Sequence, residues 1–136
     1  MSISFVHLHV HTDYSMLDGA QRCPDIVDQA IKFGMPAVAV TDHGNMSACY
    51  EMIQVAEKKG IKPILGCELY VAPDSCLIKD QSLPHYQGYH LVCLAENYQG
   101  YVNLCHLNEE AWLRGFYYKP RVDKELLHKY HEGIIA

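Results

Sequence analysis

The stretch AVAVTDHGN, residues 37–45, joins an apolar strand to a group of polar side chains. Residues 37–41 form a short run that is apolar up to its last residue, which is typical of a strand buried on both faces in a parallel sheet. Asp42, His43 and Asn45 follow directly, at the end of the strand where parallel α/β proteins gather their reactive groups. The stretch therefore predicts an α/β fold and indicates where its functional site lies.

Helical patterns flank this strand on both sides. Residues 24–33 have a proline in the first turn, and Gly34 follows them as a stop signal. Residues 47–59 place apolar side chains at i, i+3, i+4 and i+7, and Gly60 ends the pattern. The other expected elements are strands at 4–9, 63–71 and 89–95, helices at 98–113 and 123–130, and the opening of a strand at 133–136. The helix at 98–113 is expected to turn inward Tyr101, Leu104, Cys105, Ala111 and Trp112.

The alternation of strands and helices predicts the topology. Strand–helix–strand units imply parallel strands joined by right-handed crossovers. Such units describe about half of a βα-barrel, and the chain ends within an apolar strand, which leaves sheet edges unpaired. We therefore expect this chain to be the N-terminal part of a longer protein.

Composition excludes several classes of protein. The chain has 136 residues, which fits one domain, and its formal net charge of -5 argues against a free-standing nucleic-acid-binding domain. No run reaches the ~18 apolar residues of a membrane span, and the first residues lack the basic region of a secretory signal. The six cysteines form no C-x-x-C pair and several fall in apolar runs, which indicates buried thiols in a reducing compartment. We expect a cytoplasmic protein with no membrane partner.

Potential metal ligands are delivered by each of the first four expected strands or by the segment that follows it. They are His9, His11, Asp18, His43, Glu68 and His90. His9 and His11 are two residues apart, so both side chains point the same way if the strand persists that far. Imidazole nitrogen with carboxylate oxygen suits zinc, manganese or iron better than calcium or magnesium. A carboxylate such as Glu68 is able to bridge two ions about 3.5–4 Å apart, the arrangement that clamps a phosphate and activates a water.

Other polar residues near these ligands have supporting or local roles. His7 shares the face of His9 and His11 but lies nearer the start of the strand, so we expect it to hydrogen-bond behind the ligands. Asp42 has two readings that the sequence leaves open, which are orienting a ligand from behind and capping the following helix. The remaining histidines are expected to be ordinary surface or core residues: His85, His106, His128 and His131.

These residues also carry a resemblance to a known family. The chain resembles the PHP (polymerase and histidinol phosphatase) family, whose opening Leu-His-x-His-Thr motif matches residues 8–12. Further matching segments are 15–19, 41–45, 66–68 and 90–92. Within the family, the chain is similar to the PHP domains of bacterial replicative DNA polymerase III alpha subunits, at residues 13–19, 60–66, 100–104, 115–121 and 132–133.

The resemblance implies an irregular seven-stranded βα-barrel that holds up to three divalent ions, zinc or manganese, through the six candidate ligands. It implies that residues 1–136 are the N-terminal half of such a domain. The family draws further ligands, a cysteine and an Asp-x-His pair, from the second half of the barrel, and neither that half nor the polymerase domains is present in this sequence. The fragment alone is therefore expected to be inactive.

The resemblance also implies a function in DNA replication. In a parent DNA polymerase, the complete PHP domain is expected to hydrolyse phosphoester bonds, as a 3′–5′ exonuclease or a pyrophosphatase. The implied partners are DNA, a proofreading exonuclease subunit and a sliding clamp. Two alternatives stay open: a non-catalytic scaffold that docks the proofreading subunit, and a free-standing PHP phosphoesterase such as a histidinol phosphatase.

Overall fold

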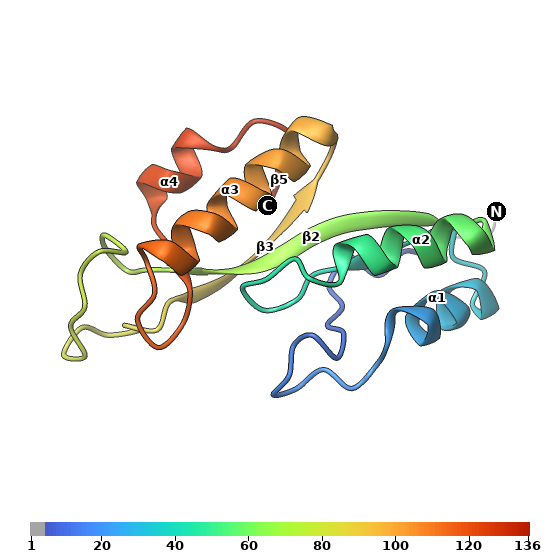
Figure 1. Ribbon diagram of the computed structural model, residues 1–136, viewed down its shortest axis with the longest axis horizontal. Helices are drawn as coiled ribbons and strands as arrows, with labels where there is room; N and C mark the ends of the chain where they lie inside the picture. Colours follow the sequence, from blue (N-terminus) through green and yellow to red (C-terminus); the bar gives the residue numbers. More distant parts are fainter. Residues whose placement is uncertain (1–4) are drawn as a thin grey trace.

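The computed structural model describes residues 5–136 and has the mixed α/β architecture that the sequence predicts (Figure 1). The first residue of the strand expected at 4–9 lies outside the described residues. In chain order the elements are α1 (Cys23–Lys32), β1 (Ala37–Val40), α2 (Cys49–Lys59), β2 (Lys62–Val71), β3 (Tyr89–Ala95), α3 (Tyr98–Leu113), β4 (Arg121–Val122), α4 (Lys124–Lys129) and β5 (Ile134–Ile135). No helix within residues 5–136 has the length and apolar character needed to cross a membrane.

The long strand β2 organises the sheet. Its first half pairs in parallel with β1, from Ala37 opposite Lys62 to Val40 opposite Leu65. Its second half pairs antiparallel with β3 and, on the other edge, in parallel with β4. Strand β5 adds antiparallel to β3. The α/β class is therefore confirmed, but the expectation that all strands run parallel is wrong for β3, which runs opposite to the other strands and so pairs antiparallel with both β2 and β5.

The direction of β3 follows from the connection that precedes it. A parallel neighbour needs a crossover, usually a helix, that returns the chain to the starting end of the sheet. Residues 72–88 contain turns but no helix or strand, and they extend beyond the end of β2 at the left of Figure 1. The chain therefore re-enters the sheet at the end where β2 finishes, and β3 runs in the opposite direction.

The expected first strand is not a regular strand in its described part. Residues 7–10 lie beside β1, because the carbonyl of His7 accepts a hydrogen bond from Ala39 and the carbonyl of Val10 accepts one from Thr41. Between these two hydrogen bonds the first segment advances by three residues, from 7 to 10, and the β1 segment by only two, from 39 to 41. The extra residue interrupts the ladder of hydrogen bonds. The hydroxyl of Thr41 fills the gap by accepting from the N–H of Val10 and donating to its carbonyl.

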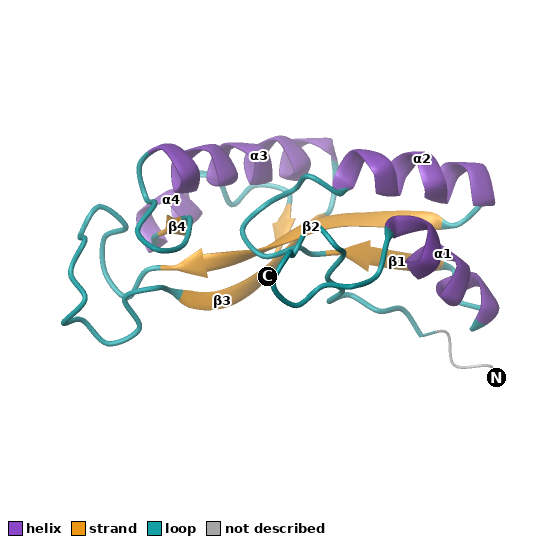
Figure 2. Ribbon diagram, turned by 60° about the horizontal axis from the view of Figure 1, so that its bottom comes forward, coloured by secondary structure: helices purple, strands orange, loops and turns teal. Residues whose placement is uncertain are grey.

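Two apolar clusters hold the helices against the sheet. One joins α1 and α2 to β1 and includes Val27, Val38 and Met52, and the other joins α3 to β2 and β3 and includes Leu69 and Leu104. Figure 2 shows α2 and α3 along the same side of the strands. Each fully buried side chain of this size contributes about 1.5–3 kcal/mol to folding. The helices therefore cover one face of β2 and leave the other available for a site.

The inward face of α3 differs from the sequence expectation. Leu104 and Ala111 are buried as expected, but Cys105 is exposed and the side chain of Trp112 is 52% exposed. The other five cysteines are buried and none of the six is in a disulfide. The prediction was wrong for Trp112 because its ring lies against the loop after β1, where its Nε1 donates to the carbonyl of Gly44 at 2.8 Å.

Candidate metal centre

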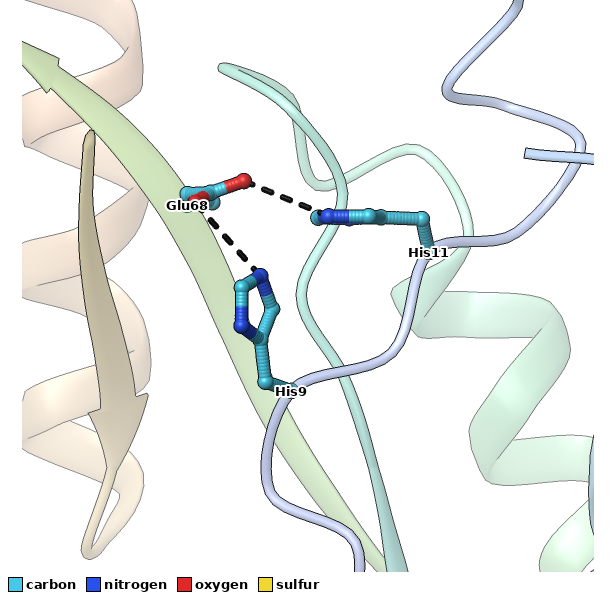
Figure 3. A group of neighbouring side chains, drawn as sticks. All are labelled: His9, His11 and Glu68. Carbon is cyan, nitrogen blue, oxygen red and sulfur yellow. Dashed lines mark ion pairs between the residues drawn. The ribbon is translucent and has the colours of Figure 1, made fainter. Parts of the chain in front are cut away.

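Glu68 lies at the centre of the candidate site, in the middle of β2. Its side chain is buried, and four histidines approach its two carboxylate oxygens. The N···O distances are 3.4 Å for His9, 3.3 Å for His11, 2.8 Å for His43 and 3.2 Å for His90. Figure 3 shows His9 and His11 pointing toward Glu68 from the irregular segment opposite the strand.

The register of the sheet explains which residues share this face. Side chains alternate along a strand, so Glu68 and Tyr70 point away from Cys67 and Leu69, which pack with α3. Tyr70 is directly opposite His90 in the antiparallel ladder. His90 is therefore a diagonal neighbour of Glu68 on the same face, within reach of its carboxylate.

A backbone contact sets the proton position of His11. Its Nδ1 lies 2.8 Å from the carbonyl oxygen of Thr41. Because a carbonyl only accepts hydrogen bonds, Nδ1 carries the proton and Nε2, which faces Glu68, keeps its lone pair. The ring of His9 meets that of His11 edge-on at 4.8 Å between centroids. The two-residue spacing thus brings both rings to one carboxylate although the strand is interrupted.

His43 lies between two carboxylates. A parallel bridge pairs its backbone with that of Glu68, and its ring stacks on His11 at 4.1 Å between centroids. Its Nε2 lies 2.8 Å from Oδ2 of Asp18, and this hydrogen bond holds the pKa of Asp18 below its usual value. Asp18, the ligand candidate furthest from any strand, is therefore drawn into the group through His43.

Two buried side-chain atoms among residues 5–136 have no hydrogen-bond partner: Nδ1 of His43 and Oε2 of Glu68. They lie 2.8 Å apart, but their relative orientation does not make a hydrogen bond. Buried polar atoms without partners are rare and cost about 1–3 kcal/mol each. A cation that accepts a lone pair from both atoms would remove this cost.

The six candidate ligands form three overlapping groups, in which the ligand atoms lie within 4.8 Å of one another. The groups are His9, His11 and Glu68; His11, Asp18 and His43; and His43, Glu68 and His90. Two ligands bound to one zinc ion at tetrahedral angles lie roughly 3.4 Å apart, given bonds of about 2.1 Å. The contacts from Glu68 to His9, His11 and His90 match that spacing. The residues present therefore fit a divalent metal ion.

Asp42 holds the first loop of the site in place. Its carboxylate accepts hydrogen bonds from the N–H and hydroxyl of Thr12, at 2.7 and 2.8 Å, and from the hydroxyl of Ser15 at 2.6 Å. Ser15 in turn accepts from the N–H of His43 at 3.1 Å. Helix α2 has Ala48 at its N-cap and no side-chain cap, so Asp42 does not cap it. Asp42 instead links the backbones that carry the ligands.

Two glycines let the site loops come together. Gly44 has a φ of +58°, which favours glycine, and a Cβ there would lie 2.6 Å from the side chain of Pro120. A Cβ on Gly19 would lie 1.7 Å from the carbonyl oxygen of Thr12. A larger residue at Gly44 would push the loop that carries His43 away from Pro120, and a larger residue at Gly19 would distort the loop that carries Asp18.

His7 and the remaining histidines lie outside the three groups. The side chain of His7 is exposed and its ring contacts that of Phe5 at 4.8 Å, so its expected role behind the ligands stays a prediction. The other four are exposed surface residues, as expected: His85, His106, His128 and His131. Burial raises the pKa of the Cys67 thiol to about 12. Cys67 also points away from Glu68, into the apolar cluster packed with α3, where its thiol donates to the carbonyl of Asp42.

A pocket of about 960 Å³ lies beside the ligand groups, and sequence reasoning missed its wall. His43 and His90 line it together with Tyr70, whose ring meets that of His90 edge-on at 4.9 Å. Burial, and then the charge of Glu68, raise the pKa of Tyr70. The signal that could have found Tyr70 is its position two residues after Glu68 on the same strand. Trp112 and Lys119 also line the pocket, and only the folded chain places them there.

Comparison with known proteins places the whole arrangement in a family. The PHP domain model matches residues 7–136. The chain belongs to the PHP domain family. Two curated relatives are the DNA polymerase III alpha subunits of Borreliella burgdorferi and Treponema pallidum, each 49% identical, over 97% and 98% of this chain. A solved structure of a provisionally assigned metal-dependent phosphoesterase from Bifidobacterium adolescentis shares the fold, with a TM-score of 0.54 and 20% identity over 78% of this chain and 32% of its own.

The PHP domain described here is short in comparison with those relatives. It spans about 12% of the length of each of the two polymerase subunits. The match therefore concerns the PHP part of those proteins, and the activity of the whole relatives does not transfer with it.

Proposed function

We propose that this PHP domain binds divalent ions, zinc or manganese, and supports hydrolysis of phosphoester bonds in a bacterial DNA polymerase III alpha subunit. The observation that carries the proposal is the environment of Glu68. Its buried carboxylate is shared by four histidines and keeps one oxygen without a hydrogen-bond partner. A buried carboxylate surrounded by imidazoles, with no lysine or arginine among its ion-pair partners within residues 5–136, is the donor set of a metal centre.

The three overlapping groups would hold up to three ions. Glu68 belongs to two groups, so its two oxygens suit it to bridge neighbouring ions. When bound, the ions supply a water of lowered pKa and positive charge beside the phosphate. The chain's own residues keep the lone pairs in place, through the contact of His11 with Thr41 and of His43 with Asp18. Lys119, in the wall of the pocket, adds a positive charge toward the phosphate.

The polymerase assignment is supported by the curated relatives. Both are polymerase subunits, which favours that origin over a free-standing histidinol phosphatase. Residues 1–136 would form the first half of the seven-stranded PHP barrel, and other parts of a longer protein would supply the remaining ligands and the polymerase domains. DNA, a proofreading exonuclease subunit and a sliding clamp would be the partners, and the cytoplasm the location. The reaction would be that of a 3′–5′ exonuclease or a pyrophosphatase.

The decisive test is metal content. We expect the double variant His9→Ala with His11→Ala to lose most of the zinc or manganese that the unaltered chain retains after gel filtration, measured by elemental analysis. The reason is that the two rings contribute to two of the three groups.

The chain offers a matched control for this test. His128 and His131 are exposed and their rings are stacked at 5.6 Å between centroids, away from Glu68. Replacing both with alanine should leave the metal content unchanged. Equal metal content in the two double variants would reject the metal site and, with it, the proposed hydrolysis.

A further inference from the structure

We infer that the pocket beside the metal centre is a subsite for a nucleobase, so that the phosphoester presented to the ions belongs to a nucleotide rather than to pyrophosphate. This inference rests on the proposed function, since it names the substrate class of the same site. The pocket has two chemically different walls. One carries Asp18, His43 and His90, and the other is mainly aromatic.

The aromatic wall has the form of a stacking platform. The rings of Trp112 and Phe116 are stacked, with centroids 5.4 Å apart and an angle of 19° between their planes. The hydrogen bond from Trp112 to the carbonyl of Gly44 ties this pair to the residue that follows the ligand His43. Both rings remain about half exposed, at 52% and 43%, and both line the pocket. A planar base stacking there would cover apolar surface that is otherwise in water.

The other polar groups of the pocket match a nucleotide. Lys119 lines the pocket and lies over the ring of Tyr70, with its Nζ 5.4 Å from the ring centroid. Gln87 places an amide group in the wall, which suits the edge of a base. The amide of Asn45 also lines the pocket, but it is already bonded within the chain. Asp13 and Asp18 also line it, so a phosphate depends on Lys119 and on bound ions for charge balance.

A buried arginine holds this wall in position. The guanidinium of Arg121 donates to the carbonyls of Cys76, Ile78 and Tyr86 in the loop after β2, and to that of Gly115 after α3. These contacts fasten the loop at 72–88, which carries Gln87, to the segment that carries Phe116 and Lys119. The platform is thus built on a fixed support and not on a free loop. Pyrophosphate, which has no apolar part, makes no use of such a wall.

Trp112 is the single tryptophan of the sequence, so its fluorescence reports directly on the pocket. We would titrate the full chain with a single-stranded DNA oligonucleotide, with the same oligonucleotide carrying an abasic residue at its 3′ end, with thymidine monophosphate and with pyrophosphate. Each titration would be run with manganese and with chelator. We expect quenching by the intact oligonucleotide and by thymidine monophosphate. The strand with an abasic 3′ end should bind at least about tenfold more weakly than the intact strand. Comparison of the strand with the mononucleotide distinguishes a strand end from a free nucleotide.

Substitutions at the platform sharpen the test. Phe116→Ala should weaken base-dependent binding about tenfold, Phe116→Tyr should preserve it because it keeps the ring, and Phe33→Ala, an exposed phenylalanine outside the pocket, should leave it unchanged. Circular dichroism and thermal melting would verify that each variant is folded.

The outcomes separate this inference from the proposed function. Retained metal with equal binding of the intact and abasic strands would overturn the nucleobase subsite and leave the metal-dependent site standing. If the chain retains no metal after gel filtration but shows base-dependent quenching, the result would support the subsite and reject the hydrolytic proposal. Tighter binding of pyrophosphate than of either base-containing ligand would also overturn the inference.

Discussion

The two sides of Glu68 differ in how their candidate ligands are held. On the β1 side, His11 is fixed by the carbonyl of Thr41, and Asp42 ties together the loops that carry the other ligands. On the β3 side, His90 is half-exposed, and Glu68 is the polar partner of its side chain within the described residues. The comparison teaches that the β1 side is pre-organised at His11 and His43, although His9 is half-exposed there, and that the β3 side is looser. Metal should be bound first where less ordering is needed.

The largest effect is expected where the two sides meet. Glu68→Gln replaces the carboxylate shared by both sides with an amide that donates hydrogen bonds, and we expect more than about a hundredfold loss of zinc or manganese affinity. Isothermal titration calorimetry would measure it. The metal-free variant should melt no lower than the unaltered chain, because a buried carboxylate is removed. Unchanged affinity would show that neither side depends on this residue.

A second prediction concerns the support of the β1 side. Asp42→Asn removes acceptors from a network of three buried hydrogen bonds, and we expect about 2–3 kcal/mol loss of unfolding free energy and roughly tenfold to hundredfold weaker metal binding. Urea denaturation and calorimetry give the two values. If stability falls while metal affinity is unaltered, the network supports the fold but does not pre-organise the ligands.

The looser side should be less sensitive. His90→Ala removes a half-exposed ligand that has few supports, and we expect about tenfold weaker metal binding with stability within about 0.5 kcal/mol of the unaltered chain. The matched variant is His43→Ala, on the ordered side, which should lose more affinity under the same conditions. Equal losses would remove the distinction between the two sides.

The smallest effect on the metal site is expected from the N-cap of α4, which directly follows β4. Asp123 is buried, and hydrogen bonds from the N–H groups of Cys76 and Leu126 outweigh desolvation and lower its pKa. Its stabilisation is therefore complete above its ordinary pKa, about 3.9, and is lost as the pH falls through the lower folded-state value. Asn keeps one accepting oxygen and leaves the other N–H group without an acceptor, so Asp123→Asn should cost about 1 kcal/mol at neutral pH and less as the solution becomes acidic, in denaturation curves from pH 7 to pH 2.

Metal affinity should stay unchanged in the Asp123→Asn variant, because Asp123 contacts none of the three ligand groups. A loss of affinity comparable to that of Asp42→Asn would show that the cap of α4 is coupled to the metal site.

Much of the fold could be predicted from local patterns. Apolar spacing with terminal glycines predicted α1 and α2 to within two residues, since these signals act within one helix. The direction of β3 could not be predicted this way, because a strand has the same side-chain alternation in either direction. Direction depends on whether the connection crosses over the sheet, and the connection at 72–88 does not.

The candidate site could likewise be predicted only in part from the sequence. Its six ligand candidates could be chosen from residue type and position, since histidines and carboxylates on or after successive strands stand out in a sequence. The aromatic wall could not, because Trp112 and Phe116 belong by spacing to a helix and its end, where such residues are commonly core. Trp112 reaches the site only through the packing of α3 beside the loop that contains Gly44.

The sequence by itself determined the helices, the buried strands and the kinds of atoms offered to a metal ion, because each depends on residues close together in the chain. The tertiary structure alone decided that β3 runs antiparallel and that His90 therefore reaches the carboxylate of Glu68. It also decided that Nδ1 of His43 and Oε2 of Glu68 are buried together without a hydrogen bond. These features depend on the register between segments far apart in sequence, which is set by the packing of the helices and by the length of the connections.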